Sequence, residues 1–532
     1  MLYFIPAWYQ KNQWRENEQN WHVRRMHTEF DDTVKQIQLF QRSGAYPYRI
    51  LLPGFSPNFR HFLHRQGVYR APYWSCFDAI QEVRRRKTMV LSFHDLKWPA
   101  GVEFVYSPFV VVAFLKGVKY AQIEFGEDGN PIQVDLFKDA KICRRNFYDD
   151  RGFVSGTIVY EDERPLYQDY LMENGVWKLR CFQSDGRVEV NPRYQNYLLL
   201  YQGKEESRRF SRLSYDSLDQ VICEVLSAYL ALTEETDIFC VAMHERHMVL
   251  LEGALRDHKV ILSFFEDRYS ISNHPEAVEM TERADYIIAD SRENRKKIWR
   301  ETGGMIENIT VITPYDSRVD FGISQQLDVQ KILVPVDGMD DVTFAELIRL
   351  LGDYLPTNAD ARVYLFTRIA DWDRKEKLLE QTRRELRRRG MKEGWAAGEE
   401  ADKNFAENNL EMEEGVPVRF FVEQCVDELA VSKCMREQRV LVDMRNTPDL
   451  YLQIMAISIG IPQIVHMWTE FVEDGENGMI LREINKLPEA LDYYLQGLKN
   501  WNKARISSYE IGKEYTADRL LEEWEGVLKS IE

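Results

Sequence analysis

The chain alternates short apolar runs with helical patterns twice along its length, and a block with a different period interrupts the first series. The first series begins at residues 2–5 and 48–53, with a helical pattern at 31–41 between them, and resumes with apolar runs at 238–241, 260–264, 286–289 and 310–312. Alternating strands and helices are most simply connected as a parallel sheet with crossover helices on its faces. We therefore predict one α/β domain whose sequence is split in two.

The interrupting block spans residues 100–212 and reads as a succession of β-strands. Its period-2 or β-branched runs include VEFVYSPFVVVAFL, YAQIEF, IQVDLF, GTIVYE, VWKLRCF and RVEVN. Turn sequences such as Gly-Glu-Asp-Gly-Asn-Pro, Glu-Asn-Gly and Ser-Asp-Gly separate these runs. Tight turns between alternating strands indicate an antiparallel β-meander, inserted here in the first α/β domain.

A second series of strands and helices follows and predicts a second domain of the same class. Its apolar runs and helical patterns lie at 331–336, 342–354, 362–366, 373–390, 418–422, 439–444 and 462–466. The last 30 or so residues have helical spacing of apolar side chains. We expect domain boundaries at 1–99 and 213–318 for the split first domain, 100–212 for the meander, 319–500 for the second domain and 501–532 for a C-terminal helix.

Charge and composition exclude several partners and locations. A net charge of −17 repels a phosphate backbone and excludes nucleic acid as a partner. The start MLYFIPAW has no basic region and is broken by Pro6, so we expect a buried strand and no signal peptide. No stretch reaches the about 20 apolar residues of a spanning helix. We expect a cytoplasmic chain.

Metal binding is not predicted. The seven cysteines are scattered without a CxxC pair, which favours reduced thiols over disulfides or a zinc site. His244 and His247 are three apart, whereas a helical zinc motif places its histidines four apart. The sequence also has no G-x-S-x-G nucleophile motif.

Residues 440–481 carry the most informative motif. They combine a strand, a helix with small residues, Gly-Ile-Pro, a second strand and Glu-Asp-Gly-x-Asn-Gly. This order resembles the segment that holds the nucleotide sugar in retaining glycosyltransferases of the two-domain GT-B fold. The resemblance implies a GT-B-like α/β fold, with two Rossmann-like domains, the antiparallel meander in the first, and a C-terminal helix that returns to the first domain.

The charged groups of such a donor site are replaced in this sequence. In the active enzymes one glutamate lies beside the transferred sugar and another on the ribose, and these places fall on Arg445 and Gln453. An Arg and a Lys grip the diphosphate, and their places align near Asp337 and Asp340 or Asp341. A carboxylate about 5 Å from a phosphate costs roughly 3 kcal/mol at an effective dielectric of about 20. The resemblance therefore implies a degenerate donor site without catalytic residues, cofactor or metal.

One loop of this motif keeps the form of a ligand site. Its residues are Thr469, Glu470, Gly475, Asn477 and Gly478. Backbone N–H groups at such a turn attract anions without any charged side chain, so the loop remains a candidate for residual ligand binding. The alternative is a turn kept for folding, with glycines where other residues would be strained.

The resemblance extends over nearly the whole chain. The segments that carry it are MLYFIPAWY, FDDT at 30–33, ADYIIADSRENRKKIWRETG at 284–303, NITVITPYDSRVDFG at 308–322 and SIGIPQI. In this order they resemble the glycosyltransferase-like accessory secretory protein of the bacterial accessory Sec system. The family implies a non-catalytic protein that binds the second and third accessory secretory proteins, engages a SecA-type motor ATPase and aids export of glycosylated serine-rich adhesins of Gram-positive bacteria.

Two alternatives stay open. One is an active retaining glycosyltransferase that modifies the adhesin, with cations such as Arg445 or Arg268 reaching the cleft. The other is a glycan-binding protein without nucleotide affinity. The aromatic residues Trp8, Tyr9, Trp14 and Trp21 suit either sugar stacking or a protein interface.

Two further charged features are expected at the protein surface. The basic clusters at 84–87 and at Arg383, Arg384 and 387–389 are either solvated helix faces or docking sites for an acidic partner or for anionic lipid at the inner face of the membrane. The acidic segment 394–415 predicts a surface loop or loose helix.

Overall fold

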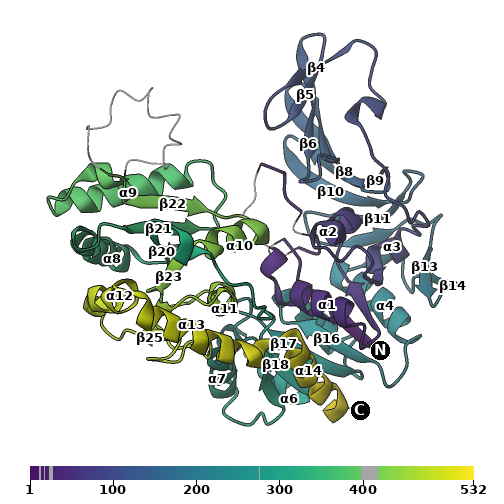
Figure 1. Cartoon of the computed structure of the whole chain (residues 1–532). Coiled ribbons are helices and arrows are strands. Elements are labelled where there is room, and N and C mark those ends of the chain that lie inside the picture. The colour runs from purple at the N-terminus through teal and green to yellow at the C-terminus, as the bar shows by residue number, and fades with distance from the viewer. Residues whose placement is uncertain (11–12, 17, 23–27, 275, 397–416, 532) are drawn as a thin grey trace. The chain divides into compact units, whose positions relative to one another are not determined.

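The computed structural model describes residues 1–532 except 11–12, 17, 23–27, 275, 397–416 and 532. The described chain divides into two compact units (Figure 1). Unit 1 comprises Met1–Asp290, Asn294–Val311 and Gly526–Glu532, and unit 2 comprises Ser291–Glu293 and Ile312–Glu525. The acidic segment predicted at 394–415 falls almost entirely outside the described residues.

A seven-stranded parallel sheet forms the centre of unit 1, in the order β19-β18-β17-β16-β1-β2-β3. All residues of β1 and β16 are buried, as expected for parallel strands covered by helices on both faces. The strands are β1 (Leu2–Ile5), β2 (Tyr48–Leu52), β3 (Tyr73–Ser75), β16 (Ile238–Ala242), β17 (Lys259–Phe264), β18 (Tyr286–Ala289) and β19 (Ile309–Val311). The helices are α1 (Asp32–Ser43), α2 (Phe59–Arg65), α3 (Cys76–Ile80), α4 (Leu218–Leu230), α5 (Met248–Glu252), α6 (Ala277–Arg283) and α7 (Arg292–Glu301).

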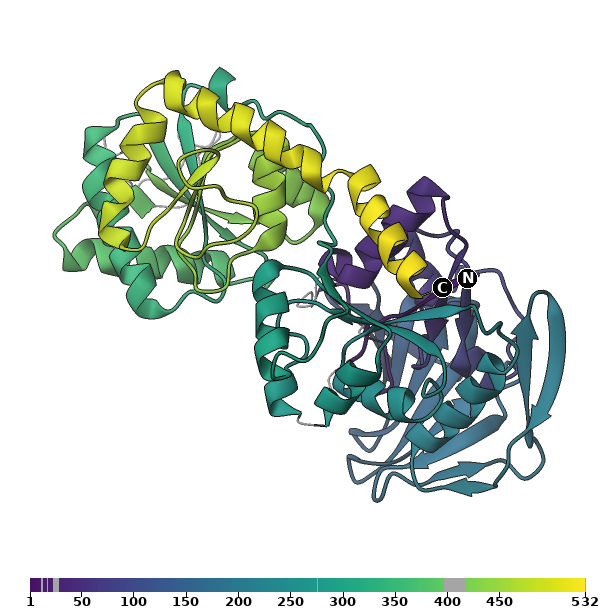
Figure 2. The same cartoon turned by 90° about the horizontal axis from the view of Figure 1, so that it is seen from below.

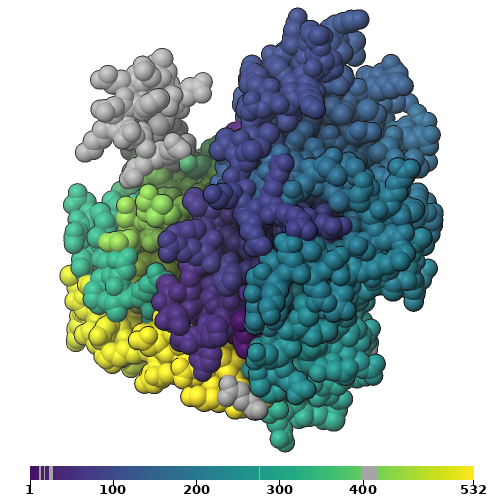
Figure 3. Space-filling model, turned by 90° about the vertical axis from the view of Figure 1, so that its right-hand side faces the viewer, coloured from purple at the N-terminus to yellow at the C-terminus, as the bar shows by residue number. Residues whose placement is uncertain are grey.

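Between β3 and β16 the chain forms an antiparallel sheet of ten strands, in the order β15-β12-β11-β10-β9-β8-β7-β6-β5-β4. These strands are β4 (Val102–Tyr106), β5 (Val111–Leu115), β6 (Val118–Phe125), β7 (Pro131–Lys138), β8 (Lys141–Asp149), β9 (Phe153–Glu161), β10 (Arg164–Leu171), β11 (Trp177–Phe182), β12 (Val188–Val190) and β15 (Ser214–Tyr215). A separate hairpin pairs β13 (Asn196–Tyr201) with β14 (Lys204–Arg209). Figure 3 shows the meander, in blue, packed against the purple and teal parts of unit 1 as one continuous surface.

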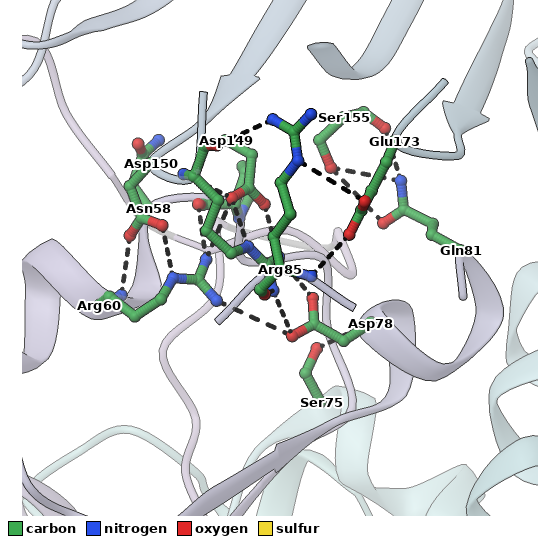
Figure 4. A network of polar contacts seen from close by, with 12 residues as sticks. Asn58, Arg60, Ser75, Asp78, Gln81, Arg85, Asp149, Asp150, Ser155 and Glu173 are labelled. Carbon is green, nitrogen blue, oxygen red and sulfur yellow. Dashed lines mark hydrogen bonds and ion pairs between the residues drawn. The ribbon is translucent and has the colours of Figure 1, made fainter. Parts of the chain in front are cut away.

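A buried polar network joins the meander to the helices of unit 1 (Figure 4). Arg151, at the turn between β8 and β9, donates to Asp149 and to Asp78 of α3, with nitrogen–oxygen distances of 2.7 Å. Arg60 of α2 pairs with Asp150 through its side chain and donates its backbone N–H to the same carboxylate at 2.9 Å. Asp149, Asp150 and Arg151 are buried, so each of these charges needs its partner, and the network fixes the meander on α2 and α3.

Unit 2 is built on a six-stranded parallel sheet, in the order β22-β21-β20-β23-β24-β25. Its strands are β20 (Gln330–Pro335), β21 (Ala361–Thr367), β22 (Phe420–Gln424), β23 (Gln438–Asp443), β24 (Gln463–Val465) and β25 (Gly478–Ile480). Its helices include α8 (Asp341–Tyr354), α9 (Arg374–Arg388), α10 (Glu428–Arg436), α11 (Leu450–Ile459), α12 (Leu487–Leu495) and α13 (Leu498–Gly512), which surround the sheet (Figure 2). The C-terminal helix α14 is Ala517–Ile531.

Two parallel sheets, the first interrupted by an antiparallel meander, are the architecture that the sequence predicts. Within the described residues, no helix combines the length and the apolarity that crossing a membrane demands.

Candidate functional site

The candidate site lies where the parallel strands of unit 2 end. Strands β20 and β23 are neighbours, but the following strands are added on opposite sides: β21 and β22 beside β20, and β24 and β25 beside β23. Such a reversal is the topological switch point at which open α/β sheets bind ligands, at the carboxyl ends of the strands. Asp337 follows β20, and Asp443 and Arg445 lie at the end of β23.

Arg445 forms an ion pair with Asp443 at the switch point. Its guanidinium donates to both oxygens of Asp443, at 2.8 and 2.6 Å, and its Nη1 donates to the backbone oxygen of Asp337 at 3.1 Å. The side chains of Arg445 and Asp443 are buried. Burial alone would disfavour the guanidinium, but Asp443, Asp449 and Asp337 hold the pKa of Arg445 above its ordinary value. The arginine therefore acts as the internal counter-ion of the site.

Asp337 is likewise paired. Its carboxylate accepts from Arg374 of α9 at 2.9 Å, from the Thr367 hydroxyl at 2.6 Å and from the Arg368 backbone N–H at 2.7 Å. The Arg368 side chain forms an ion pair of 2.8 Å with Asp449, the N-cap of α11. The edge of the sheet is thus lined by alternating charges that neutralise one another.

Arg368, Arg374 and Asp449 belong to this edge, and sequence reasoning missed them. No motif of the sequence singles them out as members of a donor site. One signal was available: Arg368 directly follows an apolar strand, which places it at the carboxyl edge of a parallel sheet.

Asp340 and Asp341 have a local role in α8. The Asp340 carboxylate caps the helix by accepting from the backbone N–H groups of Val342 and Thr343, at 3.0 and 2.9 Å. Hydrogen bonds from Thr343 lower the pKa of Asp340 below its ordinary value. Asp341 is the first helical residue and accepts from Gln381 at 3.3 Å. A negative charge here also suits the positive end of the helix dipole.

Gln453 and Thr469 meet in the interior. Gln453 has no exposed surface, and its Oε1 accepts from the Thr469 hydroxyl at 2.7 Å. The Gln453 backbone oxygen accepts from Gln463 of β24 at 3.3 Å. Gln453 therefore connects helix α11 to the loop that follows β24.

The loop after β24 is held by hydrogen bonds within itself and to neighbouring elements, among them one from Lys503 of α13 to the Gly475 oxygen at 2.9 Å. The Asn477 side chain accepts from Glu473 N–H at 2.8 Å and donates to the Phe471 oxygen at 2.9 Å. The Gly475 N–H donates to the Gly478 oxygen at 2.8 Å. Glu470 is half-buried, and its backbone oxygen accepts from the Tyr515 hydroxyl at 3.2 Å. These bonds favour the interpretation of a turn kept for folding.

Position 478 has no room for a side chain, so glycine is required there. A Cβ there would lie 2.3 Å from the backbone oxygen of Gln463. Gly475 has φ of +79°, the left-handed region that glycine enters most easily.

The candidate cation of unit 1 is also paired internally. Arg268 forms ion pairs with Asp31 at 3.1 Å and with Asp32 at 2.6 Å, at the start of α1. Burial and the neighbouring Asp32 raise the pKa of Asp31 to about 6, against the opposing effect of Arg268. Arg268 therefore balances the buried Asp32 and the half-buried Asp31.

The two histidines at 244 and 247 contribute to the core. His247 is buried, with Nδ1 2.6 Å from the Ala242 oxygen and Nε2 3.1 Å from the Tyr9 hydroxyl. Trp8, Tyr9 and Trp14 are buried as well, whereas Trp21 is exposed. The aromatic start of the chain therefore belongs mainly to the core of unit 1.

The basic clusters are largely paired with carboxylates at the surface. Arg84 contacts Glu205 at 2.6 Å, and Arg85 contacts Glu173 at 3.6 Å. In α9, Arg383 contacts two glutamates, Glu376 and Glu380, at 3.0 and 2.9 Å. Such exposed pairs are weak, about 0 to 1 kcal/mol each, so a charged partner can compete for them.

Comparison with known proteins places the chain in a family. The model of the first accessory secretory protein of the accessory Sec system matches residues 1–531. A curated relative of the same description from Streptococcus gordonii is 34% identical over 535 residues, covering 99% of each chain. A chain of the crystal structure of accessory secretory proteins 1, 2 and 3 from Streptococcus pneumoniae superposes with a TM-score of 0.80 and 29% identity, covering 100% of this chain and 99% of that one.

A more distant comparison concerns the fold. The pneumococcal O-GlcNAc transferase GtfA, solved with UDP and GlcNAc, superposes with a TM-score of 0.68 over 100% of this chain and 98% of that chain, at 12% identity. This likeness confirms the predicted GT-B-like fold. With the family model matching almost every residue, the chain belongs to the family of the first accessory secretory protein of the accessory Sec system.

Proposed function

We propose that this protein is a non-catalytic, glycosyltransferase-like component of the accessory Sec complex. In this proposal it binds the second and third accessory secretory proteins and aids the export of glycosylated serine-rich repeat adhesins. It acts in the cytoplasm, at the inner face of the membrane, where the complex engages a SecA-type motor ATPase. Family membership supports the pathway, and the similarity to a chain of the pneumococcal structure of accessory secretory proteins 1, 2 and 3 supports the partners.

The observation that carries the non-catalytic part is the pairing of charges at the switch point. Asp443 binds Arg445 in a bidentate contact, and Asp337 binds Arg374. A nucleoside diphosphate would have to displace carboxylates from these arginines while approaching the same carboxylates. Since a like charge a few ångströms away costs several kcal/mol at the dielectric of a protein surface, the pairing disfavours donor binding.

The rival function is an active retaining glycosyltransferase. Its support is that Arg368 and Arg374 bring two cations to the same edge. In this alternative a substrate would recruit them away from Asp449 and Asp337 to hold the leaving diphosphate.

Export in cells distinguishes the two functions. A strain that lacks the protein is complemented with wild type or with Arg374→Gln, and secreted adhesin is quantified together with co-purification of the other two accessory secretory proteins. We expect the wild type to restore secretion and to co-purify with both partners. We expect Arg374→Gln to do so at close to wild-type level, because in this proposal Arg374 takes no part in a reaction and Asp337 keeps its hydrogen bonds from Thr367 and the Arg368 N–H. Arg349→Gln, in an ion pair on α8, is the matched control.

Two results would contradict the proposal. Normal adhesin secretion in the deletion strain would remove the protein from the pathway. Loss of secretion with Arg374→Gln, while the protein remains folded and bound to its partners, would favour catalysis.

A further inference from the structure

Two cysteines whose spacing matches no metal motif come together in unit 2. Cys425 directly follows the edge strand β22, and Cys434 lies on helix α10. Asp427 caps α10 by accepting from the Ala430 N–H at 2.8 Å, so the chain turns back immediately after the strand. As a result the two sulfur atoms and a carboxylate oxygen of Glu423 all lie within 4.8 Å of one another.

The separation of these three atoms suits one metal ion. A zinc ion binds sulfur at about 2.3 Å and carboxylate oxygen at about 2.0–2.2 Å in a tetrahedron. Two ligands of such a tetrahedron lie somewhat less than twice the bond length apart, so three atoms within 4.8 Å can reach a common ion with small side-chain adjustments. Among the described residues, no other group of three histidine, cysteine or acidic side chains meets this criterion.

The surroundings suit a cation held by thiolates. Cys425 is buried, whereas Glu423 and Cys434 are half-buried, so an ion and a water ligand have access. The buried Gln438 donates through Nε2 toward the Cys434 sulfur at 3.6 Å, and a hydrogen-bond donor in this place orients a metal-bound thiolate.

A divalent ion offsets most of the charge of these ligands. Two thiolates and one carboxylate carry three negative charges, and a divalent ion leaves one, because the nearby Lys331 ammonium already pairs with Glu437 at 2.7 Å. The thiolate is the ligand, so a metal ion that binds here releases the protons of the two thiols. Sulfur ligands select zinc over magnesium or calcium.

We propose that Glu423, Cys425 and Cys434 form a zinc site that fastens helix α10 to the edge strand β22, with water as the fourth ligand. Such a site would hold the edge strand β22 of the unit 2 sheet in place. The donor set and the water ligand distinguish it from a closed four-cysteine site.

Cobalt is the direct probe, because thiolate–cobalt bonds absorb in the near ultraviolet. The full chain is reduced, freed of metal with a chelator and titrated with Co²⁺, then with Zn²⁺, while bound metal is quantified. We expect one ion per chain, a thiolate–cobalt band, and loss of the band on addition of zinc. Cys425→Ser and Cys434→Ser should each weaken or abolish the band. Cys181→Ser, a half-buried cysteine of the meander, should leave it unchanged.

The carboxylate is tested separately. Glu423→Gln keeps the shape of the side chain but removes its charge. Since even outer partners of a metal site contribute about 10- to 100-fold to metal affinity, we expect this variant to bind zinc at least about tenfold more weakly.

A measurement on the wild type does not depend on how the variants fold. Trypsin cleavage after Lys433 places Cys425 and Cys434 in separate peptides, so alkylation of each thiol can be followed by mass spectrometry. We expect zinc to protect both and to leave the rate at Cys181 unchanged. Absence of a thiolate–cobalt band, a band that survives both serine substitutions, or isolation of Cys425 and Cys434 as a disulfide that zinc does not prevent would each overturn the proposal.

Discussion

At the scale of single residues, Arg445 illustrates how charge is retained in the interior of this protein. It is buried beside the equally buried Asp443, with two hydrogen bonds between them. A pair of this kind adds little to stability compared with well-packed apolar residues, but each member depends on the other. In the function that we propose, this position of the donor site holds a structural cation where the resemblance to glycosyltransferases implies a glutamate.

This dependence predicts an asymmetric result for substitutions. Arg445→Met leaves Asp443 buried without a counter-ion, and we expect the free energy of unfolding to fall by about 3–5 kcal/mol in urea titrations. The double variant Arg445→Met with Asp443→Leu should recover much of this loss. Arg349→Met removes a more exposed pair of α8 and should cost less than about 1 kcal/mol. An equal, small effect of Arg445→Met and Arg349→Met would show that the switch-point pair is not buried in solution.

His247 predicts a dependence of stability on pH. Burial and the neighbouring His244 lower its pKa to about 3, against about 6.5 in an unfolded chain. The unfolded state therefore binds a proton that the folded state does not, so stability is complete above pH about 6.5 and falls as the pH decreases toward 4. In His247→Gln the slope of the free energy of unfolding against pH should therefore be smaller than in the wild type, by up to about 1.4 kcal/mol per pH unit.

Comparing the wild type with His247→Gln isolates the contribution of His247 to the pH dependence of stability. His244, whose pKa burial lowers to about 4, is present in both proteins, as are Tyr9 and Arg268. The raised pKa of Asp31 has the opposite sign and also cancels in the difference. Chemical denaturation at pH 7, 6 and 5 measures the slopes, and identical slopes would contradict the assignment.

At the scale of elements, β24, the following turn and β25 form a unit that tolerates little change. Gly478→Ala places a methyl group 2.3 Å from the Gln463 backbone oxygen and 2.8 Å from Val472 Cγ1. Because backbone cannot move away cheaply, we expect a loss of about 1–3 kcal/mol in unfolding free energy. Gly526→Ala in α14 meets no atom within 4 Å and should instead stabilise by about 0.5–1 kcal/mol. Equal effects of the two substitutions would disprove the close approach of β24 and β25.

Much of the element order follows from periodicity. The runs at 2–5, 238–241 and 331–336 are strands β1, β16 and β20, within a residue of the expected limits. The meander was also predictable, because its alternation is regular over many strands. Several of its turns were not: positions 139–140 and 162–163 have φ > 0 at both residues without any glycine, because the hairpin geometry there overrides local preference.

The site was predictable only in part. Asp337 and Arg445 were singled out from the resemblance, but Arg368, Arg374 and Asp449 were not, and only the sheet brings them to one edge. The same holds for Cys425 and Cys434, whose spacing matches no metal motif. Whether two such side chains meet depends on the turn that connects their elements. The local sequence does not encode the distance between the side chains.

At the scale of the whole molecule, the protein has a GT-B-like fold, and the charges at the switch point of its unit 2 sheet pair with one another. Such a fold is consistent with the role that we propose, a non-catalytic component of the accessory Sec complex.

Calorimetric titration of the full-length protein with UDP-N-acetylglucosamine tests the absence of a donor site most directly. UDP alone and the variant Asp337→Asn, which releases Arg374, serve as comparisons. We predict no measurable heat of binding and no hydrolysis or transfer with the wild type. Micromolar binding of the nucleotide sugar with turnover, weakened when Arg368 or Arg374 is replaced by glutamine, would contradict the account.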